Sequence, residues 1–170
     1  MVKIKWFWIW QDKKEESWLH EMALKGFHLD AIDFPCVYSF KQGQPSSIFY
    51  CMDFLNQASQ SFKQYLEPRI ESGWRLITKM NGWLYFCIAA QGGDHPELTG
   101  NKAAKAEKFQ RLMTFMVGFL PIMLLWFPVI DNRLISPFYE ILGVVFVLSL
   151  AVFTFSTFKI YQRISQLREL

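Results

Sequence analysis

Two apolar runs near the C-terminus most constrain what this chain can fold into. Residues 112–130 and 141–158 contain no Asp, Glu, Lys or Arg, and each run is at least 18 residues long. A helix that rises about 1.5 Å per residue can therefore cross a hydrocarbon core of about 30 Å within either run. Only residues 131–140 separate the two runs. The sequence predicts an antiparallel hairpin of two transmembrane helices.

Basic residues flank the predicted hairpin and indicate its orientation. Those before the first run are Lys102, Lys105, Lys108 and Arg111, and those after the second run are Lys159, Arg163 and Arg168. The connecting loop holds Arg133 beside Asp131. Because cytoplasmic flanks carry the excess of Lys and Arg, we expect a cell-membrane protein with two spans and both termini in the cytoplasm. Topology and attraction to anionic lipids explain the basic stretch, so we expect no direct contact with nucleic acid.

Four segments follow from this pattern. Residues 1–90 are expected to form a cytoplasmic α+β domain, residues 91–111 a basic linker, residues 112–158 the transmembrane hairpin and residues 159–170 a cytoplasmic tail. A chain of 170 residues suits one domain of ordinary size plus the hairpin.

The soluble part contains an internal repeat. Residues 18–29, WLHEMALKGFHL, and residues 65–76, YLEPRIESGWRL, align without a gap at an offset of 47 residues. In each copy a glycine, Gly26 or Gly73, follows a helical pattern at a position suited to a left-handed C-terminal cap. The soluble part is therefore predicted to be a duplicated domain.

Each copy is predicted to be a strand-helix-strand-strand unit. The predicted strands are residues 4–10, 27–33 and 36–41 in the first copy and residues 48–54, 74–79 and 83–89 in the second. The dipeptide Asn81-Gly82 predicts a hairpin turn. At the helix starts, Asp12 with Glu15 predicts a capping box, and Ser59 is the candidate cap of the second helix.

Two such units predict an α+β fold in which one antiparallel sheet carries both helices on one face. This architecture resembles the gyrase-inhibitor-like ligand-binding domains, in which a cleft between two similar halves takes small hydrophobic molecules. The resemblance implies a ligand cleft here, although architecture alone does not define a function.

Tryptophans are the candidate ligand-binding residues. Trp6, Trp8 and Trp10 alternate with two other apolar residues along the first predicted strand, which would make both of its faces apolar. Loops of the domain, a ligand cleft, a partner or the membrane surface could cover the second face. Trp74 and Trp83 are further candidates for the lining of an apolar pocket. All five side chains could equally belong to the core.

The sequence lacks the motifs of catalytic and metal sites. It has no Gly-rich phosphate loop, no Gly-x-Ser-x-Gly and no His-Glu-x-x-His. Its histidines and cysteines are His20, His28, His95, Cys36, Cys51 and Cys87. The histidines fall on separate predicted elements, and widely spaced cysteines of odd number are expected to be reduced and packed. We therefore expect no enzyme activity, no catalytic residues, no metal and no cofactor.

Several segments together resemble a known family. They are residues 5–8 (KWFW), 15–29 (EESWLHEMALKGFHL), 50–54 (YCMDF), 72–74 (SGW) and 82–86 (GWLYF). The chain resembles the bacterial domain-of-unknown-function 2812 family over about residues 3–111. Members often carry C-terminal membrane spans and are commonly encoded beside PadR-type transcriptional regulators, so the resemblance implies a small membrane-linked regulatory system. Residues 98–105 depart from the acidic segment usual in the family.

The favoured hypothesis is a membrane-anchored cytoplasmic binding module that senses an amphiphilic ligand or tethers a PadR-type regulator. Its expected partners are the membrane, a hydrophobic small molecule, and a regulator or membrane protein. One alternative is an accessory subunit of a membrane protein complex. A lipid-acting enzyme is the third hypothesis.

Overall fold

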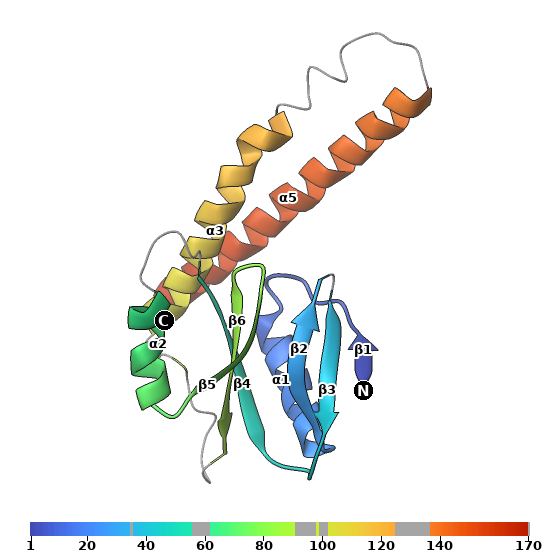
Figure 1. Ribbon diagram of the computed structural model, residues 1–170. Coiled ribbons are helices and arrows are strands. Elements are labelled where there is room, and N and C mark those ends of the chain that lie inside the picture. Colours follow the sequence, from blue (N-terminus) through green and yellow to red (C-terminus); the bar gives the residue numbers. More distant parts are fainter. Residues whose placement is uncertain (35, 56–61, 91–97, 99–101, 125–136, 170) are drawn as a thin grey trace.

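The structure is a computed structural model that describes residues 1–34, 36–55, 62–90, 98, 102–124 and 137–169. Figure 1 shows a domain of strands and two helices, from which two long helices project side by side. The long helices are α3, Lys102–Leu124, and α5, Pro137–Glu169. The chain is thus an α+β protein, as predicted.

The domain consists of two units with the same order of elements. The first unit comprises β1 (Val2–Ile4), α1 (Asp12–Leu24), β2 (Phe27–Asp33) and β3 (Val37–Gln42). The second comprises β4 (Ile48–Phe54), α2 (Phe62–Glu71), β5 (Arg75–Met80) and β6 (Trp83–Ala89). Each unit forms its own three-stranded antiparallel sheet, with the strand order β1-β3-β2 in the first and β4-β6-β5 in the second. This order of elements is that of the predicted strand-helix-strand-strand units.

The prediction of one continuous sheet is wrong, because the two sheets meet without a hydrogen-bonded ladder. Strands β2 and β5 contact each other where the sheets meet. Each of these strands has a bulge, between Leu29 and Ala31 in β2 and between Leu76 and Thr78 in β5. A bulge interrupts pairing and increases the local twist, which favours separate sheets. The two bulges lie 47 residues apart in the chain, which is the offset of the sequence repeat.

Gly26 and Gly73 end their helices in the left-handed conformation, as predicted, with φ angles of +80° and +87°. Their surroundings differ. A Cβ atom at Gly26 would lie 2.6 Å from the carbonyl oxygen of Gly43, whereas one at Gly73 would meet only the Cδ1 atom of Ile88, at 3.6 Å. The first site therefore requires glycine for both its conformation and its space.

Alanine at these two positions is expected to separate conformational cost from steric cost. Gly73→Ala should lower the free energy of unfolding by about 1 kcal/mol, the cost of a left-handed non-glycine residue. Gly26→Ala should cost about 2–3 kcal/mol, because the backbone must also move. Thermal unfolding of the full chain in mild detergent, followed by near-UV circular dichroism, measures both. Equal midpoints for the two variants would contradict this difference.

The first predicted strand, residues 4–10, is wrong beyond Ile4. Strand β1 ends there, and the chain turns so that the amide of Gln11 donates to the carbonyl oxygen of Trp8 at 2.7 Å. The tryptophans that follow β1 are therefore not presented on two faces of a strand. The predicted capping box is wrong too, since Gln11 is the N-cap and its side chain makes no capping hydrogen bond. Ser59 lies outside the described residues.

The domain has two apolar cores. One lies between α1 and the sheets and includes Leu19, Met22, Tyr38, Tyr50 and Met52. The other packs α2 against the second sheet and includes Leu55, Tyr65, Trp74, Leu84 and Phe86. A third apolar cluster joins the domain to the long helices and contains Phe54, Phe109, Leu112, Ile160 and Ile164.

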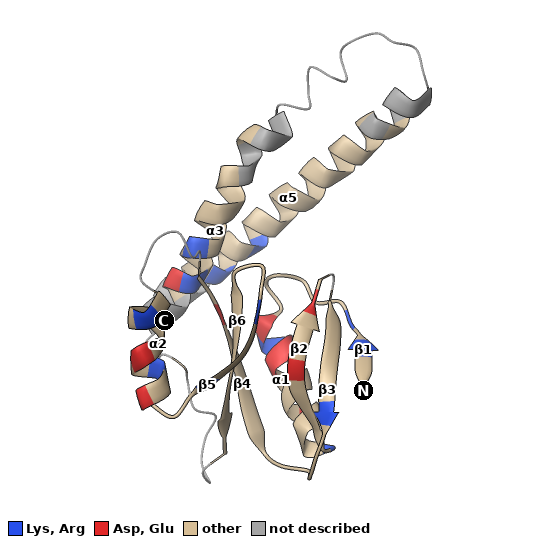
Figure 2. Cartoon of the chain, viewed as in Figure 1, with Lys and Arg blue, Asp and Glu red and all other residues tan. Residues whose placement is uncertain are grey.

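Among the described residues, one helical segment, Gly143–Ser165 in α5, is long and apolar enough to cross a membrane. This finding supports one candidate span, within the second predicted run, and does not support the predicted hairpin of two spans. Part of the first predicted span, residues 125–130, lies outside the described residues, and its first residue, Leu112, is buried against the domain. Figure 2 shows the charges of α3 and α5 gathered at the ends nearest the domain.

Residues 102–111, which the sequence suggests are a linker, form the first turns of α3 and pack on β4. The last part of α5 also packs there, through Ile160 and Ile164. The long helices are thus held against the domain by apolar contacts and by the ion pairs described next.

Candidate functional site

A cavity of about 310 Å³ lies where the domain meets α3. Its walls are mostly aromatic and methionine side chains from the N-terminal segment, β4, the β5–β6 hairpin and α3. The principal ones are Trp6, Phe7, Phe34, Met52, Phe54, Met80, Trp83, Leu112, Phe115 and Met116. Methionine and aromatic walls accommodate apolar molecules of varied shape. The arrangement suits a small hydrophobic ligand.

The carboxylate of Glu15 also lines this cavity. One of its oxygens, Oε1, accepts hydrogen bonds from the hydroxyls of Tyr38 at 2.7 Å and Tyr85 at 3.0 Å. Both of these partners are neutral. Burial raises the pKa of Glu15 above its ordinary value, and the two hydroxyl donors only partly offset this effect. An apolar cavity therefore contains one buried acid that is bonded by hydroxyl groups.

The pKa values of the two tyrosines are raised, which favours their hydroxyl form. Burial, and then the charge of Glu15, raises the pKa of Tyr38 and of Tyr85 far above the ordinary value. Their hydroxyls come from β3 and β6, one strand from each sheet. Glu15 in α1 therefore links the two three-stranded sheets beside the cavity.

Lys108 attaches α3 to α1 and β4. Its ammonium lies 2.5 Å from a carboxylate oxygen of Asp12 and donates to the carbonyl oxygen of Met52 at 3.2 Å. Burial would lower the pKa of Lys108, but the charges of Asp12 and Glu16 outweigh burial and raise it. Glu16 also accepts from the amide of Met52 at 3.0 Å.

Asp53 forms the second polar link between the domain and α3. It accepts from the hydroxyl of Tyr65 and from Arg111, 3.0 Å away, and it lies 3.5 Å from Arg69. Arg111 also donates to the carbonyl oxygen of Phe54 at 2.9 Å. Three consecutive residues of β4, residues 52–54, thus bind α3 while two of them line the cavity.

Two of the five predicted ligand-binding tryptophans, Trp6 and Trp83, line the cavity. Trp8 is exposed and stacks on Trp10, with ring centroids 5.2 Å apart. Trp10 does not line the cavity; its ring contacts that of Phe155 in α5, with centroids 5.6 Å apart. The ring of Trp8 also contacts that of Trp6, with centroids 6.0 Å apart. The three tryptophans therefore stay in contact with one another, but only Trp6 of the three lines the cavity.

Trp74 lies in the core beneath α2 and is 3% exposed, so it takes no part in this cavity. Glu15 and Tyr38 were not predicted as site residues. A signal for Glu15 existed, since it lies four residues before Leu19 and therefore on the apolar face of α1. An acidic residue on a buried helical face is a candidate for function.

Two of the histidines contact backbone carbonyl oxygens, and the cysteines form no disulfide bonds. The Nδ1 atom of His20 lies 2.7 Å from the carbonyl oxygen of Ile48, and the Nε2 atom of His28 lies 2.9 Å from that of Gln44. All three cysteines are unbridged, and burial raises the pKa of Cys51 to about 12. In the part of the chain that the structure describes, no cluster of His, Cys, Asp and Glu could hold a metal. His95 lies outside that part.

The comparisons with known proteins identify a family and no activity. A family model with the description "protein of unknown function (DUF2812)" matches residues 11–120. No curated protein and no solved structure matches the chain.

Proposed function

We propose that this chain, which belongs to the DUF2812 family, is a membrane-anchored module that binds a hydrophobic molecule with a cationic group. The observation that carries the proposal is Glu15, a buried acid beside an otherwise apolar cavity. An isolated carboxylate is costly to bury, and an ammonium ligand would neutralise that charge. Trp6 and Trp83 would add aromatic faces, which attract cations.

Ligand occupancy can act on the long helices through the cavity wall. Leu112, Phe115 and Met116 of α3 face the same space as Phe54 of β4. A ligand that changes the packing between these elements would change the position of α3 relative to the domain. This coupling is part of the proposal and accounts for a binding domain that is joined directly to membrane helices.

The anchor is proposed to be the hairpin of two spans, with both termini in the cytoplasm. The support is the candidate span in α5, the apolar sequence of residues 112–130, and the basic residues on both flanks. The domain would then meet amphiphiles at the inner surface of the membrane.

A matched pair of ligands tests the cavity. Phenyltrimethylammonium and tert-butylbenzene have the same shape and differ in charge. With the full chain in lipid nanodiscs, we expect saturable quenching of tryptophan fluorescence, with the cation bound more tightly. Glu15→Gln should weaken binding of the cation about tenfold or more and change binding of tert-butylbenzene less than about twofold. If Glu15→Gln bound phenyltrimethylammonium as tightly as the unmodified chain does, Glu15 would not be part of the binding site.

The pH dependence of binding has a defined sign. Only ionised Glu15 attracts the cation, so affinity should rise as pH increases through the pKa of Glu15, which lies above 4.5. Stability should change in the opposite direction. Because folding raises this pKa, the folded state holds the proton more tightly, and the free energy of unfolding falls as pH rises through the same window. Glu15→Gln should remove both dependences.

A role as an accessory subunit is the second candidate, and the surface of α5 favours it. Large apolar side chains along the candidate span are exposed, among them Val144, Val145, Val147 and Leu148. Either lipid or another protein's helix could cover them. Purification from membranes in mild detergent distinguishes the two, since a stoichiometric partner, such as a membrane protein or a PadR-type regulator, would remain bound.

A further inference from the structure

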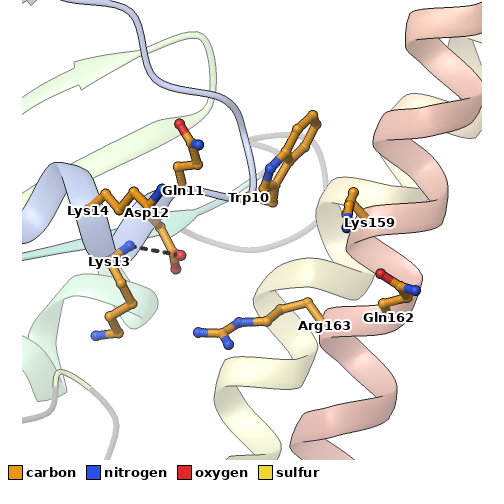
Figure 3. A pocket seen from close by; sticks show the side chains of 8 residues that line it. All are labelled: Trp10, Gln11, Asp12, Lys13, Lys14, Lys159, Gln162 and Arg163. Atoms are coloured by element: carbon orange, nitrogen blue, oxygen red, sulfur yellow. Dashed lines mark hydrogen bonds between the residues drawn. The ribbon is translucent and has the colours of Figure 1, made fainter.

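A second pocket, of about 350 Å³, lies between the start of α1 and the final turns of α5. Figure 3 shows its lining, with Lys13 and Lys14 on one side and Lys159 and Arg163 on the other. Trp10 forms part of the rim. This basic pocket is separate from the cavity that contains Glu15, and the two share none of their lining residues.

The positive charge of the basic pocket exceeds what its neighbours neutralise. Its acid, Asp12, is already bonded to Lys108 and to the amide of Lys13. Lys13 is paired with Glu16, at 2.7 Å. In Figure 3 the guanidinium of Arg163 points from α5 into the space between the helices, and its buried Nε atom has no hydrogen-bond partner among the described residues. The pocket is therefore suited to an anion.

The position of the basic pocket indicates the source of that anion. Lys159 and Arg163 lie in the last part of the candidate span, Gly143–Ser165, directly after its charge-free residues, which end at residue 158. Trp10 contacts Phe155 of the same helix, with ring centroids 5.6 Å apart. Tryptophan is enriched at the membrane interface, and basic pockets beside membrane helices bind lipid headgroups.

We propose that the basic pocket binds the phosphate headgroup of an anionic membrane phospholipid. Phosphate is matched by the fork of an arginine and the point charges of lysines. The inference rests on the membrane location in the proposed function, and it is independent of any ligand in the first cavity. Bound lipid would hold the start of α1 against the end of α5, and thus the domain against the membrane.

Native mass spectrometry of the full chain, released from mild detergent, tests this proposal. The probes are phosphatidylglycerol and phosphatidylcholine with identical acyl chains, and inorganic phosphate as a soluble competitor. We expect preferential binding of phosphatidylglycerol, with weak competition by phosphate. The double variant Lys159→Gln/Arg163→Gln should bind phosphatidylglycerol about 25-fold more weakly, about fivefold for each charge removed, and phosphatidylcholine as before.

The matched control is Lys25→Gln/Lys41→Gln, which removes the same charge from exposed positions at the end of α1 and in β3, away from α5. It should change phosphatidylglycerol binding less than about twofold. Should the double variant fail to fold, Lys14→Gln, on an exposed side chain, should still weaken binding about fivefold. Equal effects of the test and control pairs, or full displacement of lipid by phosphate, would overturn the proposal.

The same samples keep the two proposals distinguishable. Binding of phenyltrimethylammonium by the Lys159→Gln/Arg163→Gln variant should match that of the unmodified chain. A chain that does not bind phenyltrimethylammonium but does select phosphatidylglycerol would contradict the cavity proposal and support the lipid site.

Discussion

Replacing Lys108 with methionine is expected to lower the free energy of unfolding by about 3–5 kcal/mol, which is the cost of breaking a buried ion pair from one side. The substitution leaves Asp12, which is 3% exposed, without its cationic partner. It also removes the donor to the carbonyl oxygen of Met52. In thermal unfolding of the full chain in mild detergent, the midpoint should fall by about 6–20 °C.

A second substitution identifies the cause of this loss. Asp12→Asn in the Lys108→Met background removes the stranded charge, so the double variant should recover much of the lost stability. Lys14→Met, on an exposed side chain two residues from Asp12, is the control and should stay within about 0.5 kcal/mol of the unmodified chain. A double variant no more stable than Lys108→Met would show that the ion pair is not what holds α3.

The Lys108 pair is also expected to persist across the physiological pH range. The pKa of Lys108 is raised above 10.5 in the folded state, so its contribution to stability is fully present below that value. The contribution is lost only as pH rises through the raised pKa. The charge of Lys108 is therefore constant under conditions in which the charge of Glu15 can change.

Phe54→Ala is expected to have an effect of similar size, a loss of about 3–5 kcal/mol, from the large cavity that truncation of a buried phenylalanine leaves. Phe54 is 2% exposed and lies between two other rings, with centroid distances of 5.5 Å to Trp83 and 5.6 Å to Phe115. It belongs to the apolar cluster that joins β4 to α3 and α5. The same unfolding experiment measures the loss.

The control for this second prediction is Phe34→Ala. Phe34 also lines the cavity but is 73% exposed, so its truncation should change the free energy of unfolding by less than about 0.5 kcal/mol. If the two phenylalanine variants unfolded at the same temperature, the packing of the long helices on β4 would contribute little to stability.

Most strands of the domain could be predicted because their signals are local. Strands β2, β4 and β6 coincide with the predicted residues 27–33, 48–54 and 83–89. Each is a short run, mostly of apolar residues, that lies next to turn residues such as Gly26, Pro45 or Gly82. The first strand was predicted to be too long, because a run of aromatic residues is typical of a strand and here continues where the chain turns. The separation into two sheets is favoured by the bulges in β2 and β5, and the spacing of residues in the sequence does not predict a bulge.

The candidate site was predictable only in part, for a related reason. Aromatic content indicated an apolar pocket, and Trp6 and Trp83 do line one. Trp74 has the same composition signal but packs in a core. The chemistry of a side chain determines what it can bind. Whether that side chain lines a cavity depends on which helices and strands pack beside it.

Local patterns in the sequence were sufficient for the helix ends at Gly26 and Gly73, the repeated units and the apolar span of α5, since each depends on neighbours within a few residues. The partners of the buried charged residues were decided by the tertiary structure instead. In the sequence, Lys108 is one of the basic residues that indicate the orientation of the hairpin. In the structure its ammonium pairs with Asp12, 96 residues away. Glu15 meets Tyr85 across 70 residues. A buried charge takes its partner and its pKa from groups that only the assembled fold brings within a few ångströms.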